Sequence, residues 1–567
     1  MRLPRSLLLL ALVVQWVLPG SIASAQTPRG SRAQRHSRVD AIFSPWSGKA
    51  TPGCAVGVSR DGVVDYARGH GMANLEYDVP ITPRSVFNLA SVTKQFTAYS
   101  IGLLSQDGKL SLDDDIRKYL PEIPDYGKTI TIAHLMHHTN GLREQGQLLS
   151  LAGLRGDDLN TEADILDVLT RQRGVNFEPG TEILYGNAAY TLLAVIVHRV
   201  SGKPLRAFAD ERLFKPLGMT DTGFQEDHNA VVPRRAMGYF PRESGWGISM
   251  PNNDHYGASN LLSTVSDLLK WEQNLLDGRV GGPALKALMQ TSGKLNNGTE
   301  TRYGGGLHVA EHRGLRTVRH DGTGSGFRTE AVLFPDQRLA IVALCNNGSI
   351  AVTDLVWKVA EVYLGDLLKD TLPPAVAFPE AELSALAGNY WSPLTDEVVR
   401  LEVKDGALRE VGMPKAFVHI GDGAFRPGES THVWRFVAPK PQAPRELRIR
   451  DAWPTTRDFI RLSAPMPTPP DLAAFVGQYR GEEVAMTYTV RIADGKLAVR
   501  WPRRDEVVLE PVGGDRFIGS LGAVTFTRAA SGGVDGLLVS SRRLRRFRAE
   551  RMEAPRPTGA ARQASGP

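Results

Sequence analysis

Between about residue 38 and residue 368, segments with strand-like patterns lie at both ends and segments with helix-like patterns lie between them. Near the start, G-C-A-V-G-V and G-V-V-D-Y-A-R-G-H-G predict a hairpin, and late strands are predicted at 329–334 and 339–345. The periodicity of apolar residues predicts helices at 91–107, 131–138, 161–172, 186–201, 264–277 and 283–290. This order predicts an α+β fold, in which both ends of the region form one antiparallel sheet beside a helical region.

Two proline-rich stretches, 372–379 and 464–470, divide the rest of the chain. Each is followed by a similar segment: L-A-G-N-Y at 386–390 recurs as F-V-G-Q-Y, and K-D-G-A-L at 404–408 recurs as A-D-G-K-L, both 89 residues later. Two matches at one offset indicate a duplication, and alternating patterns such as V-V-R-L-E-V predict antiparallel barrels. We therefore expect a first domain at 38–368, two small lipocalin-like β-barrels at 380–463 and 471–553, and a disordered tail at 554–567.

The first 25 residues have the pattern of a secretory signal peptide. Arg2 and Arg5 precede an apolar run, and Ala23-Ser24-Ala25 provides a small-residue cleavage site. A membrane anchor is the alternative, although the run is short for a membrane span. We expect the mature protein to be exported, periplasmic or secreted, without a stable membrane anchor. Residues 26–37 are polar, and we expect them to be loose.

Composition and charge favour a globular protein. Of the 567 residues, 42% are hydrophobic and 23% are charged, which is not typical of disordered or fibrous chains. The formal net charge is +6, and part of the basic excess lies in R-R-L-R-R-F-R at 542–548. We interpret this stretch as a solvated strand face rather than a nucleic-acid or membrane patch. Cys54 and Cys345 fall on neighbouring strands of the predicted sheet. The sequence does not decide whether they form a disulfide or remain two free thiols.

Candidate chemistry begins with the run F-N-L-A-S-V-T-K-Q-F, in which Ser91 and Lys94 are three residues apart. Residues at this spacing share one face of a helix, so the hydroxyl and the amine are expected to lie side by side near the positive helix N-terminus. A serine hydroxyl becomes an effective nucleophile when a base adjoins it. Taken alone, the pair also fits a helix N-cap and a solvated lysine.

Two further clusters strengthen this interpretation: E-P-G-T-E-I-L-Y-G-N at 178–187 and R-H-D-G-T-G-S-G-F at 319–327. With them, the region 38–368 resembles the serine hydrolases of the class C β-lactamase and penicillin-recognising family, which includes DD-carboxypeptidases, D-aminopeptidases and esterases. Ser91-Val-Thr-Lys94, Tyr185-Gly-Asn187 and His320-Asp-Gly322 resemble its three motifs, in the family's order. Three landmarks agree: L-M-H-H-T-N-G-L at 135–142, L-F-K-P-L-G-M at 213–219 and G-A-S-N-L-L-S-T-V-S-D-L at 257–268.

The resemblance implies that Ser91 attacks a carbonyl carbon and forms an acyl-enzyme, which water then hydrolyses. Lys94 and Tyr185 would share the proton transfer, and which of them is the general base stays open. The backbone N–H groups of Ser91 and Thr323 would form the oxyanion hole. The substrate-binding residues that the resemblance implies are Asn187, His320, Asp321 and Gly322.

We expect neither a cofactor nor a metal. His134, His137 and His138 have a spacing that could suggest a metal, but their segment offers no carboxylate or Cys partner. The resemblance instead gives His138 a structural place in the family's His-Thr-x-Gly-Leu turn. The expected partner is a small-molecule or short-peptide substrate, not nucleic acid, and the sequence does not predict the oligomeric state.

Asp321 departs from the family pattern, because β-lactam-recognising members usually have Thr there. A carboxylate at this position would repel a substrate carboxylate, unless Asp321 points away from the pocket. We therefore expect an exported serine hydrolase of small peptides or amides, similar to the D-aminopeptidases, in whose architecture a barrel loop can reach the mouth of the active site. The alternatives are a carboxylesterase of the same family, a class C β-lactamase or DD-carboxypeptidase, and an inactive binding protein.

Overall fold

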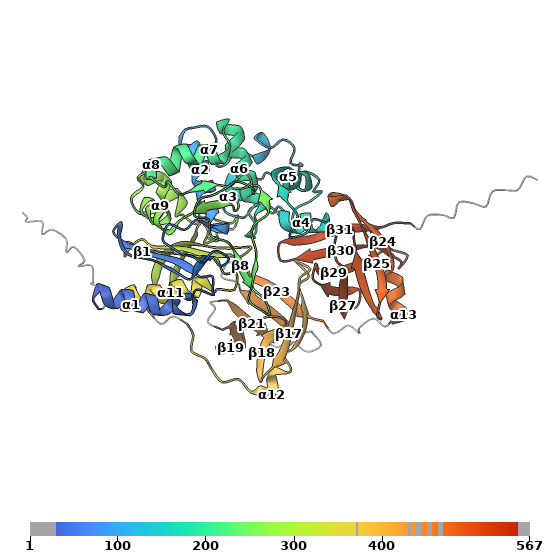
Figure 1. The fold of residues 1–567 in the computed structure, drawn as a ribbon. Coiled ribbons are helices and arrows are strands. Elements are labelled where there is room, and N and C mark those ends of the chain that lie inside the picture. The colour runs from blue at the N-terminus through green and yellow to red at the C-terminus, as the bar shows by residue number, and fades with distance from the viewer. Residues whose placement is uncertain are drawn as a thin grey trace, which may run out of the picture.

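The computed structural model describes residues 30–369, 372–428, 432–437, 445–450, 456–462 and 469–553. The signal peptide predicted at 1–25, the tail predicted at 554–567 and most of the second proline-rich stretch lie outside these residues. Figure 1 shows a mixed helix-and-sheet part followed by two strand-rich parts that lie beside it. Among the described helices, none has the length and apolar character that crossing a membrane requires.

A six-stranded antiparallel sheet forms the centre of the first part, and both ends of this part supply strands to it, as predicted. In order across the sheet, the strands are β12 (His308–His312), β13 (Leu315–Gly324), β14 (Phe327–Phe334), β15 (Leu339–Cys345), β1 (Cys54–Arg60) and β2 (Val63–His70). Cys54 and Cys345 are direct register partners and form a disulfide. Of the two states that the sequence left open, the bonded one is therefore present.

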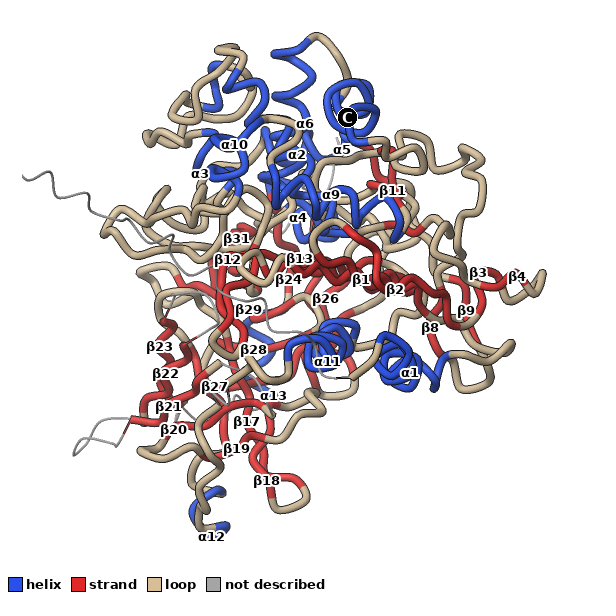
Figure 2. The backbone as a smooth tube through the Cα atoms, turned by 90° about the vertical axis from the view of Figure 1, so that its left-hand side faces the viewer, coloured by secondary structure: helices blue, strands red, loops and turns tan. Residues whose placement is uncertain are grey.

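Helices cover both faces of this sheet (Figure 2). On one face, α1 (Arg32–Phe43) and α11 (Val352–Leu364) pack against the sheet and bury Val39 and Val356. The other face carries the larger helical layer: α2 (Lys94–Gln106), α3 (Ile132–Met136), α4 (Gln145–Leu151), α5 (Glu162–Thr170), α6 (Ala188–Ser201), α7 (Leu205–Ala209), α8 (Lys215–Leu217), α9 (Val265–Asp277) and α10 (Gly282–Met289). The six helices predicted from periodicity occur as α2, α3, α5, α6, α9 and α10, with ends shifted by up to three residues.

Short strands connect the helical layer to the sheet. They are β3 (Met72–Asn74), β4 (Val79–Pro80), β5 (Phe87–Asn88), β6 (Asn160–Thr161), β7 (Gly223–Phe224), β8 (Tyr239–Pro241), β9 (Trp246–Ile248), β10 (Asn253–Asp254) and β11 (Leu261–Ser263). The strands β5, β11 and β7 form a small antiparallel sheet, from which the chain enters the turn that carries Ser91.

The expectation that residues 26–37 are loose is wrong for the part that the structure describes. Helix α1 begins at Arg32, because Ser31 and Gln34 form a reciprocal capping box. The polar side chains of its first turns face solvent, while Val39 and Phe43 are fully buried. The polar composition here belongs to the outer face of an amphipathic helix.

The C-terminal part contains two eight-stranded antiparallel sheets. The first is nearly closed, since its edge strands β18 and β19 are joined by a bridge between Arg409 and Ala416, and the second is a closed barrel. The first follows α12 (Glu380–Leu383) and consists of β16 (Gly388–Trp391), β17 (Val398–Lys404), β18 (Ala407–Glu410), β19 (Phe417–His419), β20 (Ala424–Pro427), β21 (Val433–Val437), β22 (Glu446–Arg450) and β23 (Thr456–Arg461). The second follows α13 (Pro469–Leu472) and consists of β24 (Gly477–Gly481), β25 (Met486–Ala493), β26 (Lys496–Arg500), β27 (Val507–Gly513), β28 (Arg516–Gly519), β29 (Gly522–Arg528), β30 (Val534–Ser541) and β31 (Leu544–Arg551).

Equivalent contacts recur in the two sheets and support an internal duplication. Tyr390 and Tyr479, 89 residues apart, each donate a hydrogen bond to the carbonyl four residues earlier. Arg461 and Arg551, in the last strands, each donate to backbone carbonyls of the segment that leads into the first strand. Repeats of this kind need the same local contacts to close each sheet, so the offset seen in the sequence corresponds to a structural repeat.

The second barrel packs directly against the helical layer. Tyr488 and Trp501 donate hydrogen bonds to backbone carbonyls at the end of α4. Arg143, just before α4, forms a buried ion pair with Glu483 of the barrel. The buried core of this barrel is continuous with the core of the helical layer, whereas the first barrel has a core of its own.

The turn that carries Ser91 lies beneath β13 and β14. This 3₁₀ turn, Ala90–Thr93, leads directly into α2. The Thr329 hydroxyl donates to the Leu89 carbonyl over 2.8 Å. Gly322 of β13 approaches so closely that a Cβ there would lie 2.3 Å from the Leu89 oxygen and 2.1 Å from Thr329 Oγ1. The close approach of strand and turn therefore requires glycine at 322.

Replacing Gly322 with Ala should lower the free energy of unfolding by about 1–3 kcal/mol, because the added methyl group overpacks this contact. Gly324→Ala is the matched control, since its Cβ would meet only the Ala90 side chain, at 3.2 Å, and should cost less than about 1 kcal/mol. Denaturant unfolding of both variants, followed by tryptophan fluorescence, measures the difference. Equal losses in the two variants would contradict the close approach at 322.

Candidate active site

The amine of Lys94 is the centre of the site. Its side chain is fully buried. Its Nζ lies 3.1 Å from Ser91 Oγ, 2.8 Å from Asn187 Oδ1 and 2.9 Å from the Ala258 carbonyl oxygen. The first and second motifs, far apart in the sequence, are thus brought within hydrogen-bonding distance of one nitrogen atom.

Ser91 follows a residue with unusual backbone geometry. Ala90 has φ of +47°, in the left-handed region that residues with a Cβ rarely adopt. Its N–H donates to Asn88 Oδ1 over 2.8 Å, which helps to hold the conformation. Strained residues of this kind concentrate at functional sites.

Tyr185 of the second motif packs beside the lysine. Lys94 Nζ lies 4.8 Å from the centre of the Tyr185 ring. Burial raises the pKa of Tyr185 well above its ordinary value of 10, although hydrogen bonding with Ser91 opposes the shift. Burial lowers the pKa of Lys94 to about 7, and the nearby Glu144 carboxylate partly offsets this. At neutral pH, these directions favour a neutral phenol and an amine that can accept a proton.

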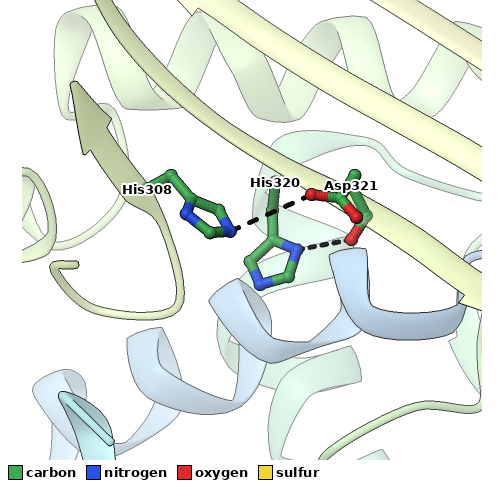
Figure 3. Close-up of side chains that lie close together, drawn as sticks. All are labelled: His308, His320 and Asp321. Carbon is green, nitrogen blue, oxygen red and sulfur yellow. Dashed lines mark hydrogen bonds and ion pairs between the residues drawn. The ribbon is translucent and has the colours of Figure 1, made fainter. Parts of the chain in front are cut away.

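The third motif lies on β13, on the other side of Ser91. His320 Nδ1–H donates to the Asp321 carbonyl oxygen over 2.5 Å, so its Nε2 accepts the hydrogen bond from the Tyr303 hydroxyl, 3.0 Å away. Burial lowers the pKa of His320 to about 4, so the imidazole is neutral. The Asp321 carboxylate lies 3.3 Å from Arg319. It also lies 3.9 Å from His308, as Figure 3 shows. Its negative charge is therefore partly compensated.

His308, His320 and Asp321 form one of two groups, among the described residues, whose ligand atoms lie close enough together to hold a metal ion. The other consists of Asp227, His228 and Asp254. In the first group, hydrogen bonds already use both ring nitrogens of His320, and Arg319 adjoins the carboxylate. We therefore interpret this cluster as a hydrogen-bonding network and assign it no metal.

The histidines at 134, 137 and 138 have separate contacts. His134 closes a capping box with Thr131 at the start of α3. His137 Nδ1 lies 3.0 Å from the Tyr303 carbonyl oxygen. His138 Nδ1 accepts from the Gly186 N–H over 3.3 Å and so supports the loop that carries Tyr185 and Asn187.

Two cavities meet at Ser91, and Asn187 and Thr323 line both of them. The first, of about 510 Å³, is also lined by residues of α4 and of the segments 251–253 and 258–260. The second, of about 450 Å³, is lined by Tyr185, His320, arginines of the second barrel, and Glu397 and Arg457 of the first barrel. All the residues predicted for the site therefore lie at or beside the place where the cavities meet, while the oxyanion role of the Ser91 and Thr323 backbones stays a prediction.

The hairpin between β30 and β31 forms part of the second cavity. The Arg543 guanidinium lies 5.0 Å from the centre of the Tyr185 ring, on which Lys94 also packs. Arg545 makes two hydrogen bonds to the Glu182 carboxylate, at 3.0 and 2.9 Å. The interpretation of 542–548 as a solvated strand face is therefore wrong for these two arginines, although it describes other exposed positions of β31. Arg543 lies in the turn before β31 and Arg545 is buried on the strand, whereas Arg546 and Arg548 are exposed.

Glu144 is a site residue that the sequence reasoning missed. Its side chain is buried, and its Oε2 accepts from the Asn187 N–H over 2.5 Å. A Cβ on Gly186 would lie 2.8 Å from this oxygen, which explains the glycine between Tyr185 and Asn187. Its position two residues after the 135–142 landmark is the sequence signal that could have revealed Glu144.

Comparison with known proteins gives several relatives. A D-aminopeptidase from Gluconobacter oxydans (strain 621H) is 27% identical over 320 residues, which cover 56% of this chain and 60% of the relative. Penicillin-binding protein 4* from Bacillus subtilis (strain 168) is 28% identical over 335 residues, covering 56% of this chain and 73% of the relative. A D-aminopeptidase from Brucella anthropi is 27% identical over 321 residues, covering 55% of this chain and 59% of the relative. Each match to a D-aminopeptidase thus spans less than two thirds of that protein.

Solved structures share the fold. The octameric penicillin-binding protein homologue from Pyrococcus abyssi superposes with a TM-score of 0.53 at 20% identity, over 84% of this chain and 99% of its own. The crystal structure of SurE gives a TM-score of 0.54 at 23% identity, over 76% of this chain and 100% of its own. The sequence model of the family described as Beta-lactamase matches residues 39–359, more than half of the chain and the whole stretch that contains Ser91, Lys94 and Tyr185. The chain therefore belongs to the Beta-lactamase family.

Proposed function

We propose that the protein is an exported serine hydrolase that forms an acyl-enzyme at Ser91 and acts on small peptide or amide substrates, in the manner of a D-aminopeptidase. The observation that carries the proposal is the set of three contacts around the buried Lys94 amine. Similarity to relatives named D-aminopeptidase supports the substrate class. The signal-peptide pattern at 1–25 supports export.

The hydrogen-bond chemistry of Lys94 favours it as the general base. Asn187 Oδ1 and the Ala258 carbonyl oxygen can only accept hydrogen bonds, so a neutral amine directs its two hydrogens at them. Its lone pair then faces the third neighbour, Ser91 Oγ, 3.1 Å away. Such an amine can accept the serine proton without rearrangement.

In the proposed reaction, Ser91 Oγ bonds to the substrate carbonyl carbon while its proton moves to Lys94 Nζ. The tetrahedral intermediate then collapses, the carbon–nitrogen bond breaks, and the leaving amine takes the proton from the lysine ammonium. A water molecule attacks the resulting ester, Lys94 accepts one of its protons, and Ser91 is released with that proton restored. Backbone N–H groups at Ser91 and Thr323 are proposed to stabilise the negative oxygen of both intermediates.

The third motif is the part of the site least suited to β-lactam substrates. The third motif of the family begins with either lysine or histidine. Here it begins with His320, which is neutral, whereas a lysine would be cationic. Asp321 adds a carboxylate, although Arg319 lies beside it. A site with this chemistry has a weak attraction for the β-lactam carboxylate, so we place a peptidase or amidase before a β-lactamase.

A fluorophosphonate probe should label the purified protein, and Ser91→Ala should abolish the label, because the probe reacts with an activated serine. Ser259→Ala is a suitable control, since Ser259 lines the same cavity and should leave the label in place. In-gel fluorescence with peptide mapping reads the outcome. An unlabelled wild-type protein would support the inactive binding protein instead.

The activity should fall below about pH 7, because Lys94 must be neutral to act as the base and burial brings its pKa to about 7. A plot of kcat/KM against pH for p-nitrophenyl acetate, which has no group titrating in this range, should rise through pH 7 to a plateau. Lys94→Gln should lower the plateau by about 10²- to 10⁴-fold. A limb that rises only above pH 9 would show that the lysine keeps an ordinary pKa.

The arginine hairpin should restrict the size of the substrate in the second cavity. In Arg543→Ala, the ratio of kcat/KM for p-nitrophenyl octanoate to that for p-nitrophenyl acetate should rise by about tenfold, because a large side chain leaves the cavity wall. Arg548→Ala is the matched control, since Arg548 is an exposed arginine of β31, the strand that follows the turn with Arg543. An unchanged ratio in Arg543→Ala would mean that the hairpin does not limit the site.

A further inference from the structure

Glu144 has a carboxylate oxygen whose partner is missing. The residue is only 3% exposed, and its Oε2 is used by the Asn187 N–H. Its Oε1 is buried and has no hydrogen-bond partner among the described residues. Leaving a buried carboxylate oxygen unpaired is unfavourable unless a ligand completes its contacts. Glu144 lines the 510 Å³ cavity that also contains Ser91.

Two further acceptors of the same cavity also lack partners. Gln145 Oε1 and Asn253 Oδ1 are buried, line the cavity and accept no hydrogen bond from the described part of the chain. A fourth buried atom without a partner, His255 Nδ1, is instead a donor, because burial keeps this imidazole neutral and its Nε2 accepts from Asn253 Nδ2 over 3.2 Å. Three of these four atoms are oxygens that can only accept. A ligand that completes this cavity must therefore supply hydrogen-bond donors.

The charges at this cavity point to a cation. Glu144 is the one carboxylate among the described residues that line it. Of its two arginines, Arg155 is paired with Asp157, and Arg504 donates to the Leu154 carbonyl while packing over the Trp501 ring. The second cavity differs, because each of its three carboxylates, Glu182, Asp321 and Glu397, adjoins an arginine. Arg543 of that cavity has no ion-pair partner among the described residues.

We propose that the 510 Å³ cavity binds the protonated primary amine of the substrate, with Glu144 as its ion-pair partner and Gln145 and Asn253 as further acceptors. This inference rests on the proposed function and specifies its substrate class: short peptides or amides with a free amino terminus. An ammonium group supplies three donors and one positive charge. In an α-amino acid it is two bonds from the carbonyl carbon that Ser91 attacks, and a cavity of this volume also accommodates a side chain.

Glu144 is then a substrate-binding residue in addition to a positioning residue. Its Oε2 holds the Asn187 backbone, and Asn187 Oδ1 contacts Lys94. A merely structural role would need only this oxygen. Recognition of the amine needs the second oxygen and the negative charge.

The test compares D-phenylalanine p-nitroanilide and its L isomer with the N-acetyl form of each, on the wild-type protein and on Glu144→Gln. The glutamine keeps an acceptor for the Asn187 N–H but loses the charge. The ratio of kcat/KM for the free amine to that for the acetylated substrate cancels any change in the reactivity of Lys94. Wild-type protein should prefer the free amine of one isomer, and Glu144→Gln should lower this ratio by about 10- to 100-fold.

Asp321→Asn is the matched variant, because Asp321 is one of three acids that line the other cavity beside Ser91, and it should leave the ratio unchanged. A ratio lowered by Asp321→Asn and kept in Glu144→Gln would assign the amine to the other cavity and overturn the inference. Equal losses for free and acetylated substrates in Glu144→Gln, or a wild-type protein without preference for the free amine, would overturn it as well. Fluorophosphonate labelling of the same preparations separates these outcomes from failure of the proposed function, in which Ser91 would not react.

Discussion

The burial of the Lys94 amine organises the first, mixed helix-and-sheet part of this protein. A lysine without contact to solvent needs acceptors for its hydrogens. The 3₁₀ turn Ala90–Thr93, the N-cap of α6 and the 257–268 landmark supply the three contacts of Lys94. Each contact comes from a different segment of the chain, so the amine is satisfied only when all of them pack together. The same burial lowers its pKa, which connects the packing of the helical layer with the proposed reactivity of Ser91.

Close packing explains the glycines in the second and third motifs. Gly186 leaves room for the Glu144 carboxylate beneath the second motif, and Gly322 lets β13 approach the turn that holds Ser91. Both positions are close to the proposed substrate. The motifs therefore combine the groups proposed to react with the close backbone contacts that bring those groups together.

The second barrel takes part in the site although the family match ends at residue 359. Its hairpin places Arg543 over the Tyr185 ring, and the Arg543 carbonyl accepts the Glu144 N–H over 3.3 Å. Hydrogen bonds to α4 and the Arg143–Glu483 ion pair hold the barrel in place. The two cavities at Ser91 consequently have walls from different parts of the chain, one rich in unpaired acceptors and the other in arginine.

By itself, the sequence determined the order of strands and helices, the duplication and the three motifs, because periodicity and spacing are local properties. It also located the residues now found around Lys94. Tertiary structure decided that Cys54 and Cys345 form a disulfide and which arginines of 542–548 face inward. It also decided the two cavities and the unpaired oxygen of Glu144, since burial and the absence of a partner depend on residues hundreds of positions apart. Local sequence patterns show which groups are present, whereas only the packed chain decides which of them remain without a partner and line a cavity.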